Sequence, residues 1–379
     1  MTHLCPPSLR SPHHVRAHAP QTYQPKLHYF FLSITCKNSK ASSDSLSLLA
    51  NMRFSHARQV SHRAIWPLWM AGMLVCCNRS HETTIAVIPK ASADLFWQSV
   101  HAGAVKSAWA NKVKIVWDGP PNETDIAGEM KIVETMINRQ VDAIALAPSD
   151  RSALKIAVNR AAAAHIPVII YDSGIDSDRY VTFVATDNYL GGQIGADRIG
   201  KVLSGKGKIV MVKTTPGGAS TTAREEGFRH ELKSKFPEIE ILDERFGMAS
   251  IAQSLTVAEN MLTAHPDLNG IFCSNESGTE GAAQALKARP AKIKLVGFDS
   301  SPLLLAELHA GVIDSLVIQD PFKMGETAVD AAVKAVKREK TPKQIFLPPR
   351  LINADNINDP DVQTQVNPDL QKYLGSPRP

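Results

Sequence analysis

The sequence predicts an α/β fold made of two doubly wound parallel-sheet lobes. From Thr84 onward, short apolar runs alternate with stretches of helical periodicity, and this alternation is typical of parallel sheets covered by helices. The first series of units extends to about Leu203, and a second series begins at Lys208. Two successive series favour two lobes over one large sheet.

The first strand–helix unit, residues 85–103, carries the most informative loop of the chain. An apolar run leads through a polar loop into a helix in which Phe96, Val100 and Ala104 recur at every fourth position. Ligands of parallel α/β sheets gather where such loops leave the carboxyl ends of the strands. We therefore expect part of a binding site in this loop.

This loop combines a cation, a carboxylate and two adjacent aromatic rings, namely Lys90, Asp94, Phe96 and Trp97. Polar groups that bond hydroxyls, beside rings that stack on C–H groups, are what a sugar pocket requires. The alternative interpretation places Phe96 and Trp97 in the hydrophobic core. The loop by itself does not separate the two interpretations.

The remaining elements follow in chain order. The first series is expected to contain further strands at 112–117, 143–147, 167–171 and 181–185, and helices at 126–139, 152–164 and 186–203. The second series is expected to contain strands at 208–212, 239–242, 270–273, 294–298 and 315–318.

Length and charge narrow the function classes. The chain has 379 residues, enough for two domains with full cores. Its formal charge of +5 is misleading, because residues 1–83 hold nine basic and two acidic residues, which leaves 33 basic and 35 acidic residues in the remainder. That balance does not indicate a basic face for nucleic acid.

Cysteine usage excludes a disulfide framework or a metal-ligand set in the body of the chain. Four of the five cysteines lie before residue 78, and only Cys273 lies beyond it. Cys273 belongs to an apolar run and is expected to be a small buried hydrophobe.

The first eighty residues predict export. Residues 1–51 lack periodicity and are interpreted as disordered or as the product of a start codon assigned too early. Residues 52–83 have arginines followed by a short apolar stretch, as in a secretory signal. The end of this stretch resembles a bacterial lipobox with Cys77 as the acylated residue, although Cys76 replaces the usual small residue. The mature protein is therefore expected in the periplasm, or anchored to a membrane and facing the periplasm.

Polar residues again follow the strands of the second series. They are Arg224, Asn275, Asp299 and Gln319. An arginine fork, a carboxylate and two amides supply directional donors and acceptors for hydroxyl groups. Each also has another interpretation: Asn275 and Asp299 could cap helices, and Arg224 could pair with a neighbouring glutamate on a solvated face.

Several motifs in the body resemble those of periplasmic sugar-binding proteins of the ribose, allose and galactose type, which serve ABC importers. The similarity covers residues 84–352 and rests on four stretches: Ala185-Thr186-Asp187-Asn188 with Gly191-Gly192, Ala223-Arg224 with Gly227-Phe228, residues 262–266, and Val296-Gly297-Phe298-Asp299. The resemblance implies a type I periplasmic binding protein fold that captures a monosaccharide or a related polyol.

The ligand positions of that family fall on the residues already singled out. They match Lys90, Asp94, Phe96, Trp97, Asp172, Arg224, Asn275, Asp299 and Gln319. The pair Lys90 and Trp97 is closer to the allose type than to the ribose type. Ser173 stands where ribose binders place an arginine, and Ala249 where they place an aromatic ring. The stacking surface on that side is therefore expected to be reduced, or to come from a neighbour such as Phe246 or Met248.

The resemblance also implies three crossings between the lobes, near Thr186, Gln319 and Leu347, which form a three-strand hinge. The lobes would comprise 84–186 with 320–347, and 187–319 with 348–357, followed by a tail at 358–379. Asp172 and Arg224 would face each other across the cleft, and Asp187 would cap the helix that follows it. The implied partner is an ABC permease in the membrane, and the chain is expected to be a monomer without cofactor or metal.

Three other functions were weighed against import. A sugar receptor for a sensor kinase or a chemoreceptor would show the same sequence features. A repressor of the lactose-repressor family needs a helix-turn-helix before the core, where this chain has a signal-like apolar run. An enzyme is least favoured: Asp94, Asp172 and Asp299 could supply a glycosidase pair, but there is no motif for a nucleophilic serine or cysteine.

Overall fold

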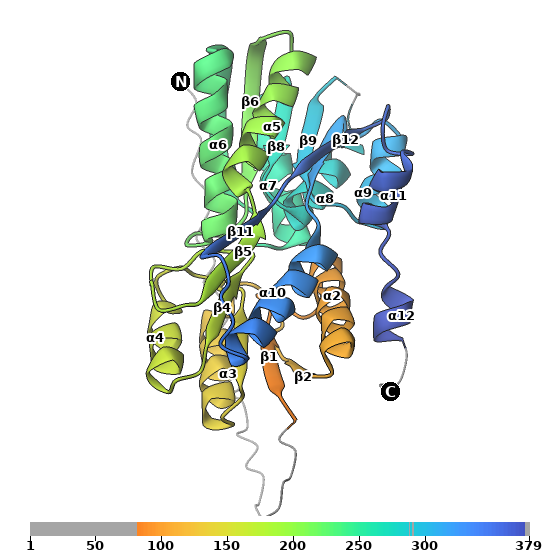
Figure 1. The fold of residues 1–379 in the computed structure, drawn as a ribbon. Coiled ribbons are helices and arrows are strands. Elements are labelled where there is room, and N and C mark those ends of the chain that lie inside the picture. Colours follow the sequence, from red (N-terminus) through yellow and green to blue (C-terminus); the bar gives the residue numbers. More distant parts are fainter. Residues whose placement is uncertain (1–81, 288, 290–291, 376–379) are drawn as a thin grey trace, which may run out of the picture. The chain divides into compact units, whose positions relative to one another are not determined.

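The computed structural model describes residues 82–287, 289 and 292–375. It contains two six-stranded sheets, each in its own lobe, as the sequence predicts (Figure 1). The first 51 residues, Cys77 and nearly all of the export segment 52–83 lie outside the described residues. None of the described helices is long and apolar enough to cross a membrane.

The first lobe is built on a parallel sheet whose strands pair in the order β11 (Gln344–Leu347), β5 (Thr182–Thr186), β4 (Val168–Tyr171), β3 (Ala143–Leu146), β1 (Thr84–Ile88) and β2 (Lys114–Trp117). Helices α2 (Leu95–Asn111) and α10 (Pro321–Val336) cover one face, and α3 (Ile126–Asn138) and α4 (Lys155–Ala163) cover the other. Along β1, Ile85 and Val87 face the first pair while Ala86 and Ile88 face the second, which is the two-residue period of a strand buried on both faces.

The second lobe repeats this plan. Its strand order is β12 (Arg350–Asn353), β10 (Ser315–Ile318), β9 (Lys294–Phe298), β8 (Gly270–Cys273), β6 (Lys206–Lys213) and β7 (Glu238–Phe246), and only β12 is antiparallel to its neighbour. One face packs on α5 (Asn188–Val202) and α6 (Ala219–Lys235). The other packs on α7 (Ile251–Ala264), α8 (Glu276–Lys287) and α9 (Pro302–His309).

The chain passes between the two sheets at three places. It leaves β5 for α5 through Asp187, β10 for α10 through residues 319–320, and β11 for β12 through residues 348–349. Asp187 caps α5, because its Oδ1 accepts from the backbone N–H of Leu190 at 3.1 Å. The capping role expected for Asp187 is therefore confirmed.

A close helix pair stiffens each lobe. A side chain at Gly103 of α2 would overlap the carbonyl oxygen of Phe322 in α10, and one at Gly325 would overlap that of Val100. In the pair α5–α6, a side chain at Gly192 would overlap the carbonyl oxygen of Arg224, and one at Gly227 would overlap that of Tyr189. These contacts require glycine, because a Cβ would force the two backbones apart.

Element boundaries differ from the sequence prediction where local backbone decides them. Lys112 ends α2 in the left-handed conformation at φ 53°, so the second strand begins at Lys114. Residues 151–154 form turns before α4, which starts three residues later than expected. The strand expected at 239–242 extends to Phe246.

The expected tail at 358–379 instead contains two helices, α11 (Pro360–Val366) and α12 (Leu370–Leu374). Val362 of α11 is fully buried in the core of the second lobe. The ring of Tyr373 in α12 packs 5.4 Å from that of Trp109 and 5.5 Å from that of Phe322, both in the first lobe. The end of the chain therefore contacts both lobes.

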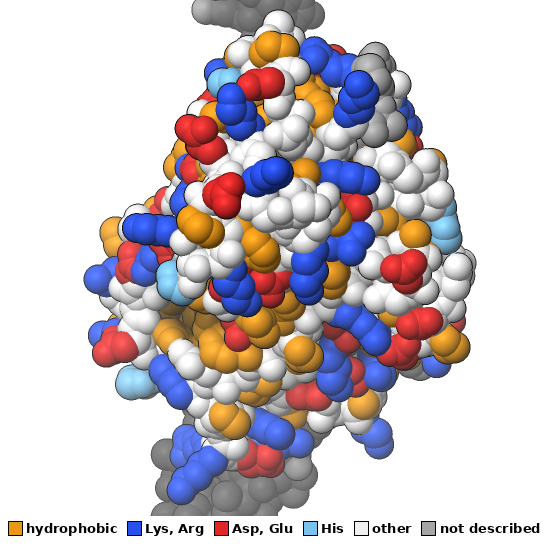
Figure 2. Space-filling view, turned by 90° about the horizontal axis from the view of Figure 1, so that it is seen from above, with side chains coloured by type: hydrophobic (Ala, Val, Ile, Leu, Met, Phe, Trp, Pro, Cys, Tyr) orange, Lys and Arg blue, Asp and Glu red, His pale blue; other side chains and the backbone are white. Residues whose placement is uncertain are grey.

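The surface seen from above carries both charge signs. Figure 2 shows acidic and basic side chains interspersed over this face, without an extended patch of one sign there. Several exposed charges of the second lobe are paired, such as Lys235 with Asp197 and Lys208 with Asp267.

Candidate ligand-binding site

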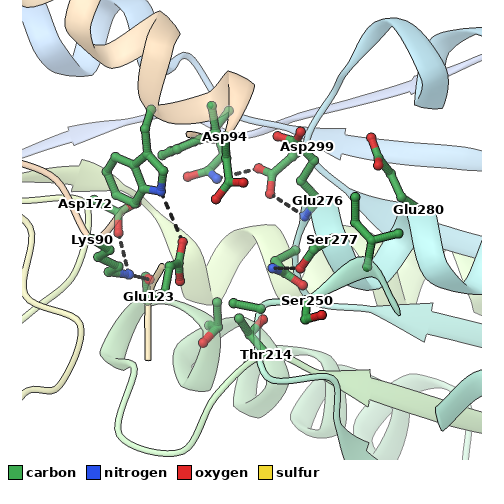
Figure 3. Close-up of a pocket in the computed structure, with 18 of the residues that line it drawn as sticks. Lys90, Asp94, Glu123, Asp172, Thr214, Ser250, Glu276, Ser277, Glu280 and Asp299 are labelled. Atoms are coloured by element: carbon green, nitrogen blue, oxygen red, sulfur yellow. Dashed lines mark hydrogen bonds and ion pairs between the residues drawn. The ribbon is translucent and has the colours of Figure 1, made fainter. Parts of the chain in front are cut away.

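A cavity of about 340 Å³ lies between the two lobes, and all nine predicted ligand positions line it. The first lobe contributes residues that follow β1 and β4, and the second contributes α6 and the residues after β8 and β9 (Figure 3). The carboxyl ends of parallel strands in both sheets therefore meet at one space.

Lys90 and Asp172 form a buried ion pair on the first-lobe side. The Lys90 Nζ lies 2.6 Å from Asp172 Oδ2, and the two side chains are 5% and 4% exposed. Lys90 Nζ also donates to Ser220 Oγ in α6 of the second lobe, at 3.1 Å. Asp172 has a left-handed backbone, φ 59°, which is uncommon for a residue other than glycine and recurs at functional sites.

Arg224 is held rigidly on the second-lobe side. Its Nε donates to Asn188 Oδ1 and its Nη1 to the Ser274 carbonyl, both at 2.8 Å. The guanidinium lies 4.2 Å from the centre of the Phe298 ring and 3.8 Å from Asp299 Oδ2. Arg224 is 2% exposed, so the interpretation as a solvated surface ion pair is wrong.

Asp299 links the cavity to the hinge. Its Oδ1 accepts from Gln319 Nε2 at 2.6 Å and its Oδ2 from the backbone N–H of Glu276 at 2.9 Å. Gln319 Oε1 in turn accepts from Thr186 Oγ1 at 2.7 Å. Asp299 also has a left-handed backbone, φ 72°, and the cap of α9 is Ser301 instead. Asn275 does cap a helix, since its Oδ1 accepts from Gly278 N at 3.0 Å.

The two aromatic rings serve the core and the cavity together. Phe96 and Trp97 pack edge to face at 4.9 Å, and Trp97 packs on Tyr171 at 6.3 Å. Trp97 is 2% exposed, and its Nε1 donates to Glu123 Oε1 at 3.1 Å. Both rings therefore belong to the core of the first lobe and also line the cavity.

Comparison with known proteins assigns this architecture to a family. The model of the periplasmic binding protein domain matches residues 85–340. The chain belongs to this family. The expected resemblance and fold are confirmed.

Individual relatives align with the chain over most of their own length. The ribose import binding protein of Bacillus subtilis is 29% identical over 71% of this chain and 87% of its own length. The D-allose-binding periplasmic protein of Escherichia coli is 27% identical over 72% of this chain and 90% of its own length. A solved solute-binding protein from Agrobacterium radiobacter, in complex with D-arabinose, is 32% identical with a TM-score of 0.74, covering 76% of this chain and 99% of that one. One from Agrobacterium vitis with bound D-fucose is 33% identical with a TM-score of 0.73, covering 75% and 100%.

The departures from the family pattern have visible consequences in this periplasmic binding protein. Ser173 Oγ accepts from the backbone N–H of Ser220 at 3.0 Å and so joins the two lobes. Ala249 lines the cavity, but neither Phe246 nor Met248 is among the lining residues, and Ile251 lies there instead. Among the described lining residues, neither Phe246 nor Met248 supplies a stacking surface, which agrees with the expectation that this surface is reduced.

Sequence reasoning missed several polar residues of the cavity. They are Glu123, Thr214, Ser220, Thr221, Ser250, Glu276, Ser277 and Glu280. Glu123 could have been found, since it stands in the loop that follows β2. Glu276 begins α8, where a glutamate is ordinarily explained by the helix dipole.

Burial and mutual repulsion shape the ionisation of these acids. Burial, together with the nearby Asp299, Glu280 and Asp94, raises the pKa of Glu276 to about 9. Burial also raises the pKa of Asp299, against the effect of Arg224. The pKa of Glu123 is raised by burial too, and Lys90 opposes this.

A further buried acid, Glu129, lies behind the cavity on α3. Its side chain accepts from the backbone N–H of Ser149 at 3.1 Å, and its other oxygen has no hydrogen-bond partner among the described residues. Burial raises the pKa of Glu129 to about 7. The folded protein therefore binds a proton there that the unfolded chain releases above about 4.5, so the stability contributed by this group falls as the pH rises from 4.5 to 7.

Glu129→Gln should remove this pH dependence. The amide keeps an oxygen for Ser149 but has no charge to bury, so the variant should exceed the parent in stability at pH 8 by up to roughly 3 kcal/mol. Chemical denaturation between pH 5 and pH 8 measures the difference. Glu134→Gln is the control, because Glu134 lies on the same helix in a surface pair with Arg160. An unchanged pH slope in Glu129→Gln would show that Glu129 does not titrate in this range.

Proposed function

We propose that this protein captures a monosaccharide or a related polyol between its lobes and delivers it to an ABC importer. The observation that carries the proposal is the convergence of charged and amide side chains from both sheets, beside Phe96 and Trp97, on one cavity. The relatives named for ribose import and D-allose binding, and the solved structures with D-arabinose and D-fucose, support a sugar as the ligand.

The two lobes offer complementary hydrogen bonds to a ring of hydroxyls. Lys90 and Asp172 present a donor and an acceptor from the first lobe, and Arg224 and Asp299 do so from the second. Charged groups bond neutral hydroxyls more strongly than neutral groups do. Because each cation is already held against a carboxylate, the donors are fixed before the ligand arrives, which lowers the cost of binding.

Closure of the lobes completes the site. In the structure, the first turn of α6 contacts the first lobe through Ser220. The backbone N–H of Ser220 donates a hydrogen bond to Ser173 Oγ, and its Oγ accepts one from Lys90 Nζ. The N–H of Arg151 also bonds the carbonyl of Gly217 at 3.1 Å. A ligand that bridges both lobes favours this closed arrangement by its differential affinity. The closed form is then what the permease receives.

Asp172→Asn should weaken binding by about 10- to 100-fold, because it removes a charge from a buried hydrogen bond to the sugar. The sugar is first identified by a thermal-shift screen of D-ribose, D-allose, D-arabinose, D-fucose and D-galactose, and affinity is then measured by calorimetry. Asp187→Asn is the matched control, since it makes the same change at a helix cap outside the cavity. Binding within twofold of the parent by a folded Asp172→Asn would place the site elsewhere.

Small-angle X-ray scattering should report a smaller radius of gyration when that sugar is added at saturation. The reason is that contacts such as Ser220 with Ser173 form only when the lobes approach. Asp172→Asn binds the sugar more weakly. At a sugar concentration that saturates the parent but lies below the dissociation constant of the variant, Asp172→Asn should keep the larger radius of gyration. An unchanged radius with saturating sugar would exclude closure as the response to binding.

We further propose that the protein is exported, from the signal-like segment 52–83. Mass spectrometry of the native protein should then detect no peptide from residues 1–51. A diacylglyceryl group on Cys77 would identify a lipoprotein anchored at the membrane, whereas a chain cleaved after Cys77 would be free in the periplasm. Peptides from residues 1–51 in the mature protein would contradict export by this segment.

A further inference from the structure

The cavity between the lobes has more acidic than basic side chains. Its two cations are each paired with an acid of their own lobe, Lys90 with Asp172 and Arg224 with Asp299. Four more carboxylates line the same space and have no cation of their own among the residues that line the cavity: Asp94, Glu123, Glu276 and Glu280. A site for neutral hydroxyls alone does not require this excess.

Glu276 is the one of these four acids with a buried side-chain oxygen that has no partner among the described residues. That oxygen is Oε2. By comparison, one oxygen of Glu123 accepts from Trp97 Nε1, and one of Glu280 accepts from Ser301 Oγ at 2.6 Å. A buried oxygen without a partner costs free energy that a ligand donor can recover.

Asp94 brings a second acid to Glu276 from the opposite lobe. Asp94 precedes α2 and makes no side-chain cap to that helix, while Glu276 begins α8. Figure 3 shows the two side chains on the same side of the cavity, near Asp299. A cation at this place would offset the repulsion among the three acids and bond to both lobes.

We propose that the ligand is a monosaccharide or polyol that carries an ammonium group, held between Asp94 and Glu276. This inference rests on the proposed function and specifies its ligand class. An ammonium offers three donors and a positive charge in the volume of one hydroxyl. The remaining hydroxyls keep the contacts described above with the two fixed ion pairs.

Binding of the ammonium would release a proton. Without a cation, Glu276 faces Asp299, Glu280 and Asp94, and together with burial they raise its pKa to about 9, with only the backbone N–H of Phe96 opposing. The carboxyl is then protonated at pH 7. A bound ammonium favours the ionised form, so the carboxyl proton passes to the buffer, whereas a neutral sugar leaves it in place.

Calorimetry with matched ligands tests the inference. The probes are D-glucosamine against D-glucose, D-galactosamine against D-galactose, and 3-amino-3-deoxy-D-allose against D-allose, at pH 7 in phosphate and in Tris. For at least one pair we expect the amino sugar to bind more tightly by about tenfold or more, as for a charge-assisted hydrogen bond. The two buffers should give different heats for that amino sugar and equal heats for its parent.

Glu276→Gln should abolish both the preference for the amino sugar and the buffer dependence of its binding heat. Glu226→Gln is the control, because Glu226 is exposed on α6 and does not line the cavity. If Glu276→Gln does not fold, proton release by the parent protein still decides the question.

The outcomes separate this inference from the proposed function. Neutral parents that bind as tightly as their amino partners would overturn the ammonium ligand and leave sugar capture intact. An amino preference that survives in a folded Glu276→Gln would overturn the role of Glu276. Failure of every sugar and amino sugar to bind would overturn the proposed function and this inference with it.

Discussion

The site depends on one device that occurs in each lobe: an aspartate directly after a strand, in a left-handed backbone conformation, that holds a cation. Asp172 follows β4 and pairs with Lys90, and Asp299 follows β9 and lies against Arg224. The unusual φ values turn both carboxylates into the cavity, and the strands behind them are buried on both faces. The sheets therefore absorb the backbone strain that the site requires.

Helix packing within each lobe and the segments that connect the lobes bear on the proposed closure. The glycine contacts between α2 and α10, and between α5 and α6, bring the two backbones of each pair close together, and the proposed closure would turn these packed lobes against each other. Gln319 lies in one of the connecting segments, bonded to Asp299 and to Thr186. Because α11 packs on the second lobe and α12 on the first, residues 367–369 between them must also adjust when the lobes rotate.

The fold could be predicted from the alternation of strands and helices. The nine cavity residues could be predicted from polar residues that follow strands, taken together with the resemblance to sugar-binding proteins. A polar residue after an apolar run, as at Asp172 or Asp299, has little other reason to recur in every unit. Glu276 was missed because its position at a helix start has an ordinary explanation, and only the approach of Asp94 from the other lobe changes that. The helices α11 and α12 were missed for a similar reason: their few apolar residues, such as Val362 and Tyr373, pack on parts of the chain far away in sequence.

Under the proposed function, the buried ion pairs serve recognition more than stability. Removing two charges from water costs about as much as their attraction returns, so pairs such as Lys90 with Asp172 would be poor devices for holding a lobe together. Their value lies in fixing the direction of donors and acceptors before a ligand arrives. The unpaired acids behave differently, since Glu276 Oε2 has no hydrogen-bond partner within the described part of the chain. Under the proposed ligand class, such a cavity is prearranged for hydroxyls at its ion pairs, and the ammonium supplies the partner that Glu276 Oε2 lacks among the described residues.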